Sequence, residues 1–375
     1  MNNKLSTFLL TCSLALFSAH AAAELSGSDA KKVRQGIQDK DLARFIIKHT
    51  KRISFNDNGR PERLDMSRQG LRHLPRDMEK LKSLKELNLK DNQLGRVPAA
   101  VLSMFKLQEL DLEGNGIDKL PAAIADLTKL QDLSLRDNSV RQLPRAIGKL
   151  RHLRRLNLSN NKLSELPDEL DRLSSLEYIS LSNNNLNRFP RVLLDLPRLE
   201  SLTLIGNDIP RLPPRIDRIS TLERLEMFGN ELTELPDSIC ELSQLEKLSV
   251  SSNKVTELPR CIGQLSKLRT LSAYDNRLNR IPHSVTRLSN LFMLSLNRNQ
   301  LKTLPDDMGR LANLKHLNLE GNPIRVLPRS VRKLDKLESL GTTYGDQKKK
   351  YERRRGESPK QFFKRCYDFE WRDDA

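Results

Sequence analysis

The sequence contains few cysteines and few aromatic residues. Its 375 residues include four cysteines and one tryptophan, and aromatic residues amount to 5%. Four cysteines in 43.0 kDa are too few for a disulfide-rich scaffold. A mean hydropathy of −0.57 and 37% hydrophobic residues exclude a polytopic membrane protein. The apolar residues are largely regularly spaced leucines, which argues against a disordered chain.

Motifs that carry catalysis are also missing. The chain has no GxxxxGKS/T, HExxH, GxSxG or CxxC motif, which argues against the nucleotide-binding, metalloprotease, serine-hydrolase and dithiol chemistries that these spacings support. Five histidines lie beyond residue 23, at positions 49, 73, 152, 283 and 316: His49, His73, His152, His283 and His316. No two of them have the spacing of metal ligands. The sequence therefore predicts a protein that is not an enzyme and needs neither a cofactor nor a metal.

Residues 1–23 have the features of a secretory signal. Lys4 supplies a positive start, residues 8–17 form a short apolar stretch, and small residues near 19–23 offer a cleavage pattern. The stretch is too short to span a bilayer comfortably, and no stop-transfer run follows it. The alternatives are an uncleaved anchor or a lipoprotein signal, but Thr11 precedes Cys12 where lipidation requires Gly, Ala or Ser. We predict a cleaved signal peptide and a secreted or periplasmic protein.

The rest of the chain is dominated by a repeat of 23 residues, LxxLxLxxNxLxxLPxxIxxLxx, which runs without an insertion or deletion. Its first leucine recurs at positions 84, 107, 130, 153, 176, 199, 222, 245, 268, 291, 314 and 337. Its asparagine recurs at positions 92, 115, 138, 161, 184, 207, 230, 253, 276, 299 and 322. Such regularity predicts stacked repeats, each of which buries its leucines only against its neighbours.

Each part of the unit has a physical interpretation. In a segment such as Leu87-Asn88-Leu89 the leucines alternate with an outward side chain, which predicts a short strand. The repeated asparagine must satisfy backbone groups where the chain leaves the strand, because unpaired buried amides are costly. The proline ends the turn, and the spacing of Ile124 and Leu127 predicts one short helical turn with an inward apolar face.

The pattern resembles the leucine-rich-repeat family over about 280 of the 375 residues. Its LPxxIxxL half is similar to the class found in Ras-group scaffold proteins and bacterial secreted leucine-rich-repeat proteins. The resemblance implies an α/β leucine-rich-repeat solenoid. This is a curved horseshoe with a parallel sheet on the concave face, short helical turns on the convex face and helical caps. It also implies protein–protein binding.

The two ends must differ from the repeats, because an open solenoid exposes its leucines there. We predict an N-terminal helix and hairpin cap over 24–60, about 12 repeats over 61–340, and a C-terminal helical cap with a basic run over 341–375. Residues 28–50 suit a helix, and Asn56–Gly59 suits a hairpin turn. The C-terminal helix would begin at Ser358-Pro359 and carry Phe362, Cys366 and Phe369. Its alternative role is to bind a partner or a membrane.

Three cysteines remain beyond the signal, and the odd number leaves a free thiol or an intermolecular bond. Cys240 and Cys261 fall in the convex turns of adjacent repeats, so geometry allows a bridge, but the sequence leaves this open. The triplet 366–368 resembles the CxD signature of ubiquitin ligases in some bacterial leucine-rich-repeat effectors. Those enzymes need a sizeable helical domain, whereas only about 35 residues follow the repeats. Because cysteine-rich end caps are missing, we favour a bacterial source.

The formal net charge of +17 is not on the predicted concave sheet. Its outward positions, the third, fifth, seventh and eighth of each unit, carry eight basic and eleven acidic residues. The excess base lies on convex turns and in the run at 348–355. Solvated positive faces are the simplest interpretation, and an anionic lipid or glycan surface is the alternative. Because no aromatic row accompanies the base, we do not expect nucleic-acid binding.

The concave sheet is uneven in a way that predicts an interface. Early repeats carry the carboxylates Glu109, Asp111, Glu113 and Asp132, and later repeats carry the apolar residues Tyr178, Ile205, Phe228, Tyr274 and Met293. Folding gains nothing from apolar side chains held outward, although isolated examples are normal. We predict that the apolar residues anchor a protein partner and that the carboxylates attract a basic segment flanking its apolar anchors.

These observations predict a monomeric, non-enzymatic interaction scaffold that binds a protein on its concave face. A pathogen effector or adhesin that engages a host protein is one alternative, since it would use the same surface. An envelope protein held to anionic glycan or lipid by its basic convex face is another.

Overall fold

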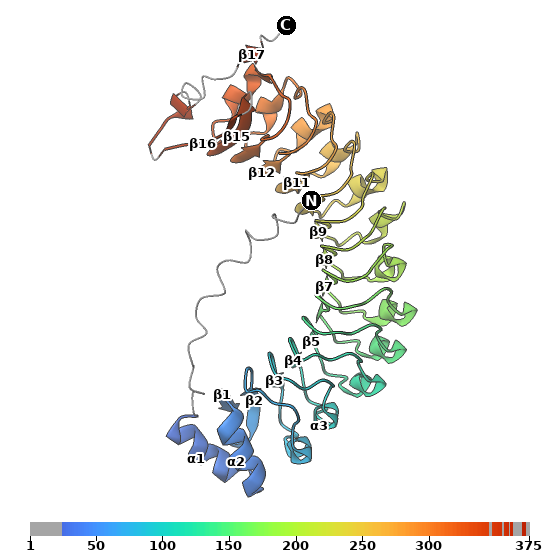
Figure 1. The fold of residues 1–375 in the computed structure, drawn as a ribbon, viewed down its shortest axis with the longest axis vertical. Coiled ribbons are helices and arrows are strands. Elements are labelled where there is room, and N and C mark those ends of the chain that lie inside the picture. The colour runs from blue at the N-terminus through green and yellow to red at the C-terminus, as the bar shows by residue number, and fades with distance from the viewer. Residues whose placement is uncertain (1–24, 345–346, 355, 360, 363–369, 373–375) are drawn as a thin grey trace, which may run out of the picture.

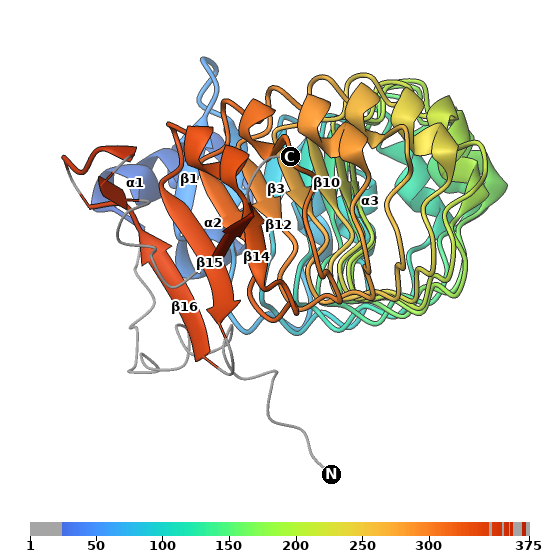
Figure 2. The ribbon, with the colours of Figure 1, turned by 90° about the horizontal axis from the view of Figure 1, so that it is seen from above.

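The chain folds into an open, curved solenoid (Figure 1). The computed structural model describes residues 25–344, 347–354, 356–359, 361–362 and 370–372. Strands follow the inner side of the arc and short helical segments follow its outer side (Figures 1 and 2). The predicted signal segment lies outside the described residues. None of the helices in the described part of the chain has the length and apolar character needed to cross a bilayer.

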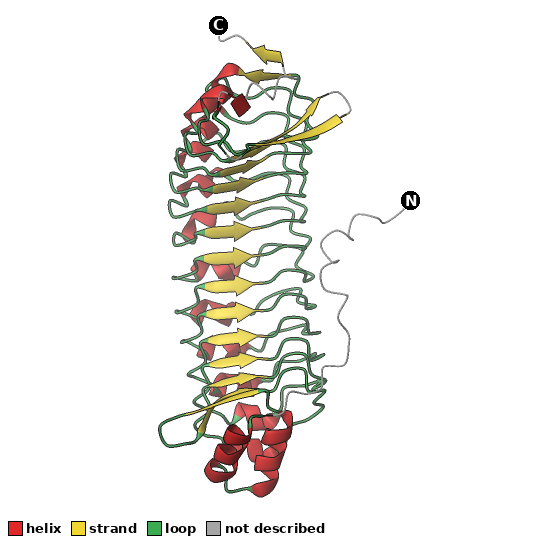
Figure 3. Cartoon of the chain, turned by 90° about the vertical axis from the view of Figure 1, so that its left-hand side faces the viewer, coloured by secondary structure: helices red, strands yellow, loops and turns green. Residues whose placement is uncertain are grey.

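One sheet of 15 strands runs along the solenoid (Figure 3). Its strands are parallel except at the two edges, where β1 and β16 pair antiparallel with their neighbours. The repeated strands are β3 Glu86–Asn88, β4 Glu109–Asp111, β5 Asp132–Ser134, β6 Arg155–Asn157, β7 Tyr178–Ser180, β8 Ser201–Thr203, β9 Arg224–Glu226, β10 Lys247–Ser249, β11 Thr270–Ser272, β12 Met293–Ser295 and β13 His316–Asn318.

The three-residue strands confirm the interpretation of the LxL pattern. Leu133 and Leu156 pair across β5 and β6, exactly one repeat apart in the sequence, and are 2% and 0% exposed. The residues on either side of each buried leucine point to the concave face, because side chains alternate along a strand. One continuous core therefore extends through all repeats, and the register of the concave side chains follows from the 23-residue period.

The repeated asparagines form a buried ladder, as predicted. The Asn138 amide donates from Nδ2 to the carbonyl oxygens of Leu112 and Leu135, each at 2.9 Å. Its Oδ1 accepts from the backbone N–H of Ile117 at 2.8 Å. Asn161 repeats this pattern with Leu135, Leu158 and Val140. Each asparagine thus satisfies backbone groups in its own repeat and in the preceding one.

Removing one rung of this ladder should destabilise the solenoid. Asn138→Ala removes the acceptor of two buried N–H groups, those of Ile117 and Asn115, and each such group costs about 1–3 kcal/mol. The carbonyls of Leu112 and Leu135 also lose a donor but keep one each from Asn115 and Asn161. We expect the free energy of unfolding to fall by roughly 3 kcal/mol in urea titrations followed by circular dichroism. Asn187→Ala, at an exposed asparagine outside the ladder, is the control. An equal loss in both variants would contradict the structural role of the ladder.

Short helical segments cover the outer side of the repeats, as the LPxxIxxL spacing predicts. In the Ala122–Asp126 segment Ile124 is buried, and the N–H of Leu127 bonds to its carbonyl. These segments are α3 Ala99–Leu102, η1 Arg76–Lys80, η2 Ala122–Asp126, η3 Arg145–Lys149, η4 Asp168–Arg172, η5 Arg191–Asp195, η6 Ile216–Arg218, η7 Asp237–Glu241, η8 Ile262–Gln264, η9 His283–Arg287, η10 Met308–Arg310 and η11 Arg329–Lys333.

At the N-terminal end, two helices and a hairpin stand where we predicted one helix and a hairpin. The helices are α1 Gly27–Gly36 and α2 Lys40–His49, and the hairpin strands are β1 Arg52–Phe55 and β2 Pro61–Asp65. Asp39 starts α2 by accepting hydrogen bonds from the N–H groups of Asp41 and Leu42. These bonds and the ammonium of Lys80 lower the pKa of Asp39 to about 2. A Cβ at Gly36 would lie 2.5 Å from the Gly59 carbonyl oxygen, so the chain needs glycine at this close approach.

At the C-terminal end a hairpin that we did not predict follows the last repeat, and residues 359, 361 and 362 are helical where the predicted helix begins. The strands β15 Ser339–Tyr344 and β16 Gln347–Glu352 pair antiparallel, so the lysines at 348–350 lie on an edge strand. Strand β14 Val326–Pro328 pairs with β17 Glu370–Arg372. The N–H of Gln361 bonds to Ser358 Oγ, and Phe362 is fully buried. Residues 363–369, which include Cys366 and Phe369, lie outside the described residues. The hairpin satisfies backbone groups that the last parallel strand would otherwise leave open at the edge of the sheet.

A disulfide joins Cys240 and Cys261, which resolves the question that the sequence left open. Their Cα atoms are 5.8 Å apart. Gly148 and Glu169 occupy the positions equivalent to Cys240 and Cys261 in an earlier pair of repeats. They are also close together, because a Cβ at Gly148 would lie 2.2 Å from the Glu169 carbonyl oxygen. The bridge therefore uses a contact that the stacking of repeats already creates, and it ties η7 to the start of η8.

Loss of this bridge should lower stability without changing the fold. The cysteines are 21 residues apart, and closing a loop of that size contributes about 3 kcal/mol. We expect the Cys240→Ser/Cys261→Ser variant to melt several degrees below the wild type, with an unchanged circular dichroism spectrum. A reductant should lower the melting temperature of the wild type toward that of the variant, and leave the variant unaffected. A wild type insensitive to reductant would contradict a stabilising bridge.

Candidate functional site

The predicted site residues fall into three columns on the concave face. The first column holds the first residue of each strand: Glu109, Asp132, Tyr178 and Met293. The second holds the third strand residue, here Asp111, and the third holds the residue two places after the strand: Glu113, Ile205, Phe228 and Tyr274. Glu109 is exposed and the other eight are partly buried. The sheet therefore presents all nine side chains on the same face.

The residue that follows the third column adopts a left-handed backbone in every repeat. Asp91, Asp137 and Asn160 have φ near +55°, and Gly114 and Gly206 have φ above +60°. Glycine, asparagine and aspartate tolerate this conformation best, which explains why they recur there. At Gly206 a Cβ would also lie 2.2 Å from Asn183 Oδ1, so glycine is needed for space as well. This sharp turn ends the concave sheet along one side.

An apolar cluster lies on β8 to β11 and consists of Ile205, Phe228 and Tyr274. Ile205 and Phe228 occupy the same column in adjacent repeats. The rings of Phe228 and Tyr274 are two repeats apart, with centroids at 6.0 Å and a tilt of 42°. Between them Ser251 is fully buried and accepts a hydrogen bond from the N–H of Tyr274. A small residue at this position lets the two rings meet across a repeat, which sequence reasoning did not detect.

The other two predicted anchors lie apart from this cluster. Tyr178 is in the first column on β7, between Arg155 and Ser201 on the neighbouring strands. Met293 is in the first column on β12, beside Thr270 and His316. The five predicted anchors thus form one central cluster and two outlying positions on the same face. Burial in the cluster raises the pKa of the Tyr274 hydroxyl, and the neighbouring Asp275 charge adds to this.

An acidic hollow of about 730 Å³ lies on the concave side of the first repeats. Glu109, Asp111, Asp132 and Tyr178 line it, together with residues of the N-terminal hairpin. The structure therefore brings three of the four predicted carboxylates to one place. Glu113 lies outside the lining, in the third column.

Intramolecular ion pairs already neutralise half of these carboxylates. Asp132 accepts a 2.8 Å bond from the guanidinium of Arg155, and Glu113 lies 2.9 Å from the Lys90 ammonium. Glu109 and Asp111 have no ion pair among the described residues. Asp111 accepts only a 2.9 Å bond from the N–H of Glu113. Asp65 and Arg52 of the hairpin also line the hollow without an ion pair in the described part of the chain, so Glu109 and Asp111 supply its net negative charge only after these two offset each other.

The environment of Glu109 and Asp111 disfavours their charge. Although Glu109 is exposed, the surrounding protein partly desolvates its carboxyl group, and this is the main cause that raises its pKa; the charges of Glu86 and Asp132 raise it further. Burial also raises the pKa of Asp111, and the bond from the Glu113 N–H partly offsets this. Because these pKa values are raised in the folded protein, ionisation of the two carboxylates lowers the free energy of unfolding at a pH above them. This loss of stability disappears as the pH falls and the carboxylates become protonated. A cation placed in the hollow would favour the charged form of both groups and so oppose these shifts.

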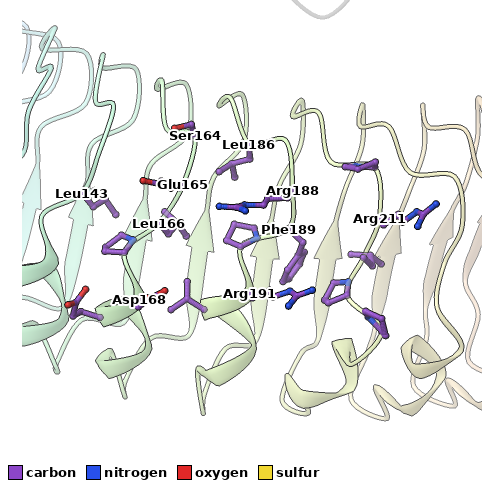
Figure 4. Close-up of a pocket in the computed structure, with 18 of the residues that line it drawn as sticks. Leu143, Ser164, Glu165, Leu166, Asp168, Leu186, Arg188, Phe189, Arg191 and Arg211 are labelled. Carbon is purple, nitrogen blue, oxygen red and sulfur yellow. The ribbon is translucent and has the colours of Figure 1, made fainter.

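A hollow of about 1150 Å³ on the middle repeats was not predicted (Figure 4). It lies along the connections from the strands to the short helices of the middle repeats (Figure 4). Its lining includes the buried residues Phe189 and Leu212. The signals in the sequence are a phenylalanine where the other repeats have leucine, valine or isoleucine before proline, and a second proline at 214. Arginines such as Arg188 and carboxylates such as Glu165 are mixed around it, so it favours no single charge. Within the described chain, no three His, Cys, Asp or Glu residues are grouped to hold a metal.

Comparison with known proteins agrees with the architecture. Family models described as "Leucine-rich repeat region" and "Leucine rich repeat" match residues 99–204 and residues 60–117 and 274–324, respectively. A leucine-rich-repeat protein from Leptospira interrogans is 32% identical, with a TM-score of 0.64 and coverage of 74% of this chain and 82% of that one. This chain belongs to the leucine-rich-repeat family. The family and its structural neighbours indicate a protein-interaction scaffold, and nothing in these comparisons shows catalytic activity.

Other solved leucine-rich-repeat proteins share the fold. An internalin from Listeria monocytogenes is 23% identical with a TM-score of 0.60, covering 84% of this chain and 98% of that one. The ectodomain of the receptor kinase GASSHO1/SCHENGEN3 from Arabidopsis thaliana, solved with Casparian strip integrity factor 2, is 28% identical with a TM-score of 0.55. That match covers 72% of this chain and 40% of the receptor. No curated protein matches the sequence.

Proposed function

We propose that this leucine-rich-repeat protein binds a protein partner on its concave face, outside the cytoplasm. The observation that carries the proposal is the cluster of Ile205, Phe228 and Tyr274 on a sheet face whose other side chains are mostly polar. Aromatic and aliphatic side chains at the centre of a patch supply most of the binding energy in protein interfaces. Tyr178 and Met293 would contact the same partner at the two outlying positions.

The partner should present a basic segment beside its apolar anchors. Glu109 and Asp111 keep unpaired charges in the acidic hollow, and that hollow lies on the same face as the apolar cluster. A lysine or arginine of the partner would stabilise the charged form of both carboxylates, which burial and the neighbouring carboxylates disfavour. Glu113 and Asp132 are already paired, so we assign them a smaller part in attracting the partner than the sequence indicated.

Several features support a location outside the cytoplasm. The disulfide between Cys240 and Cys261 is of a kind that persists in oxidising compartments. Residues 1–23 have the composition of a signal peptide. The receptor ectodomain among the structural neighbours was solved with Casparian strip integrity factor 2, which is consistent with a solenoid that receives another polypeptide.

The test is chemical cross-linking in the producing organism with the mature wild type and the Ile205→Asp/Phe228→Asp variant. A protein that the wild type captures and the variant does not would support the concave site. Equal capture by both would overturn it. Fractionation of the same cells should recover the protein in the periplasm or the medium, and recovery in the cytoplasm would overturn the proposed location.

A further inference from the structure

A basic hollow of about 510 Å³ lies on the flank of the solenoid, near its C-terminal end. By flank we mean the positions on either side of the first leucine of each repeat, where the chain enters the strand. Lys267, Arg269, Lys315 and Lys336 line this hollow, and Glu246 is its only acidic residue. The acidic hollow and the apolar cluster lie elsewhere, and they share no residue with it.

Most of the positive charge in this hollow is not neutralised. Lys267 Nζ donates to Gln244 Oε1 at 2.5 Å, and Lys336 Nζ donates to Asn313 Oδ1 at 2.6 Å. These amides orient the ammonium groups but leave their charge in place. Arg269 has no carboxylate within ion-pair distance in the described part of the chain. Only Lys315 is paired, at 2.7 Å from Glu338.

The same hollow contains one of the two large apolar side chains that the described residues expose. Phe292 is 38% exposed and occupies a position where neighbouring repeats carry charged residues. Lys315 Nζ lies 5.5 Å from the centre of its ring, and the His316 ring meets it edge-on at 5.1 Å. Asn290 and Asn313 fix the floor by donating to the carbonyls of Ser266 and Ser289, each at 2.8 Å. The ring is therefore held at the surface among cations.

The spacing of the cations selects an extended ligand. Lys267 and Lys336 occupy the same register three repeats apart, so they are separated by about 14 Å at about 4.8 Å per strand. One small anion cannot contact both. A polymer with several negative charges can, and a ring with polarised C–H groups on its face would pack on Phe292, since the face of an aromatic ring is negative.

We propose that this flank binds an acidic polysaccharide, with Lys267, Arg269 and Lys336 contacting its charged groups and Phe292 packing against a sugar ring. The site is independent of the concave surface, and it lies on the flank rather than on the convex turns. It gives the excess positive charge a local role: a flexible anionic polymer would align along the repeats and leave the concave face free for a protein.

The test uses dextran sulfate as the probe and uncharged dextran as its control, measured by calorimetry on the full-length mature protein. We expect the protein to bind dextran sulfate and not uncharged dextran. The Lys267→Gln/Lys336→Gln variant should bind dextran sulfate at least about tenfold more weakly than the wild type at 0.15 M salt. The matched control is Lys106→Gln/Lys129→Gln, which makes the same change in the same register of earlier repeats, where both lysines are exposed. A similar loss of affinity in the control variant would mean that only the net charge of the protein matters, and it would overturn the proposed site.

Two further variants separate this proposal from its neighbours. Phe292→Ala should weaken the binding of dextran sulfate about fivefold and leave the binding of poly-glutamate unchanged, because only the sugar packs on the ring. Equal loss for both polymers, or no loss for either, would overturn the assignment to a polysaccharide. The Ile205→Asp/Phe228→Asp variant should bind dextran sulfate like the wild type, so failure of the concave proposal and failure of this one are distinguishable. Circular dichroism must first show that all variants fold alike.

Discussion

Replacing Ile205 and Phe228 by aspartate is expected to abolish capture of the partner while the solenoid stays folded. Both side chains are partly buried on the concave face, and Phe228 contacts the ring of Tyr274. Losing two apolar anchors and placing two charges at the interface should weaken binding at least about 100-fold, or roughly 3 kcal/mol. The measurement is titration of the purified variant against the partner identified by cross-linking, with circular dichroism to compare the folds.

A control with the same change in net charge separates the interface from general repulsion. Thr128→Asp/Ser174→Asp adds two negative charges at exposed turns that follow the short helices. This variant should bind within about twofold of the wild type, because exposed charges away from an interface are screened. If both double variants lose binding alike, the partner responds to overall charge. If neither does, the concave cluster is not the site.

Leu156→Asp should unfold the repeats around β6 cooperatively. Leu156 is fully buried between Leu133 and Ile179 on the adjacent strands. The change removes its packing and buries a carboxylate without a partner, which together cost roughly 5 kcal/mol or more. Each repeat is stabilised mainly by its two neighbours, so the loss should spread to them rather than stay local. Urea unfolding should then show a lower midpoint and a smaller slope.

The control is Ser174→Asp, which adds the same charge at an exposed turn. Ser174 lies less than one repeat after Leu156 in the sequence. It should change the free energy of unfolding by no more than about 0.5 kcal/mol. Hydrogen exchange can locate the effect in the Leu156→Asp variant. Loss of protection confined to residues 155–157 would contradict cooperative stacking, whereas loss across β5 to β7 would confirm it.

Repetition explains how much of the fold was predictable. A unit of constant length places Leu133 beside Leu156 whatever the intervening turn does, because both must enter the same core. The role of the asparagine ladder followed from the need to pair buried backbone groups. The ends have no repeat to define them. The pattern predicted a helix from Ser358 onward, where the described residues 359, 361 and 362 are helical, but it did not predict that β16 pairs with the open backbone of β15.

The candidate site was predictable as a face but not as a set of free charges. The register put Glu109, Asp111, Glu113 and Asp132 on the concave sheet. It could not show that Lys90 and Arg155 would neutralise two of them, since that depends on how long side chains cross between strands. The contact of Phe228 with Tyr274 likewise requires that the intervening Ser251 be small enough for the rings to meet above it.

By itself, the sequence determined the repeat, the parallel sheet and the face on which each side chain lies. The face of each side chain follows from the alternation of side chains along a strand, which has a period of 2 residues. The repeat and the parallel sheet follow from the 23-residue period of the sequence. The tertiary structure alone decided that Cys240 bonds to Cys261, that Glu109 and Asp111 stay unpaired, and that Phe292 lies among lysines from different repeats. Each of these depends on side chains 21 or more residues apart, whose rotamers and distances are set only when the repeats stack.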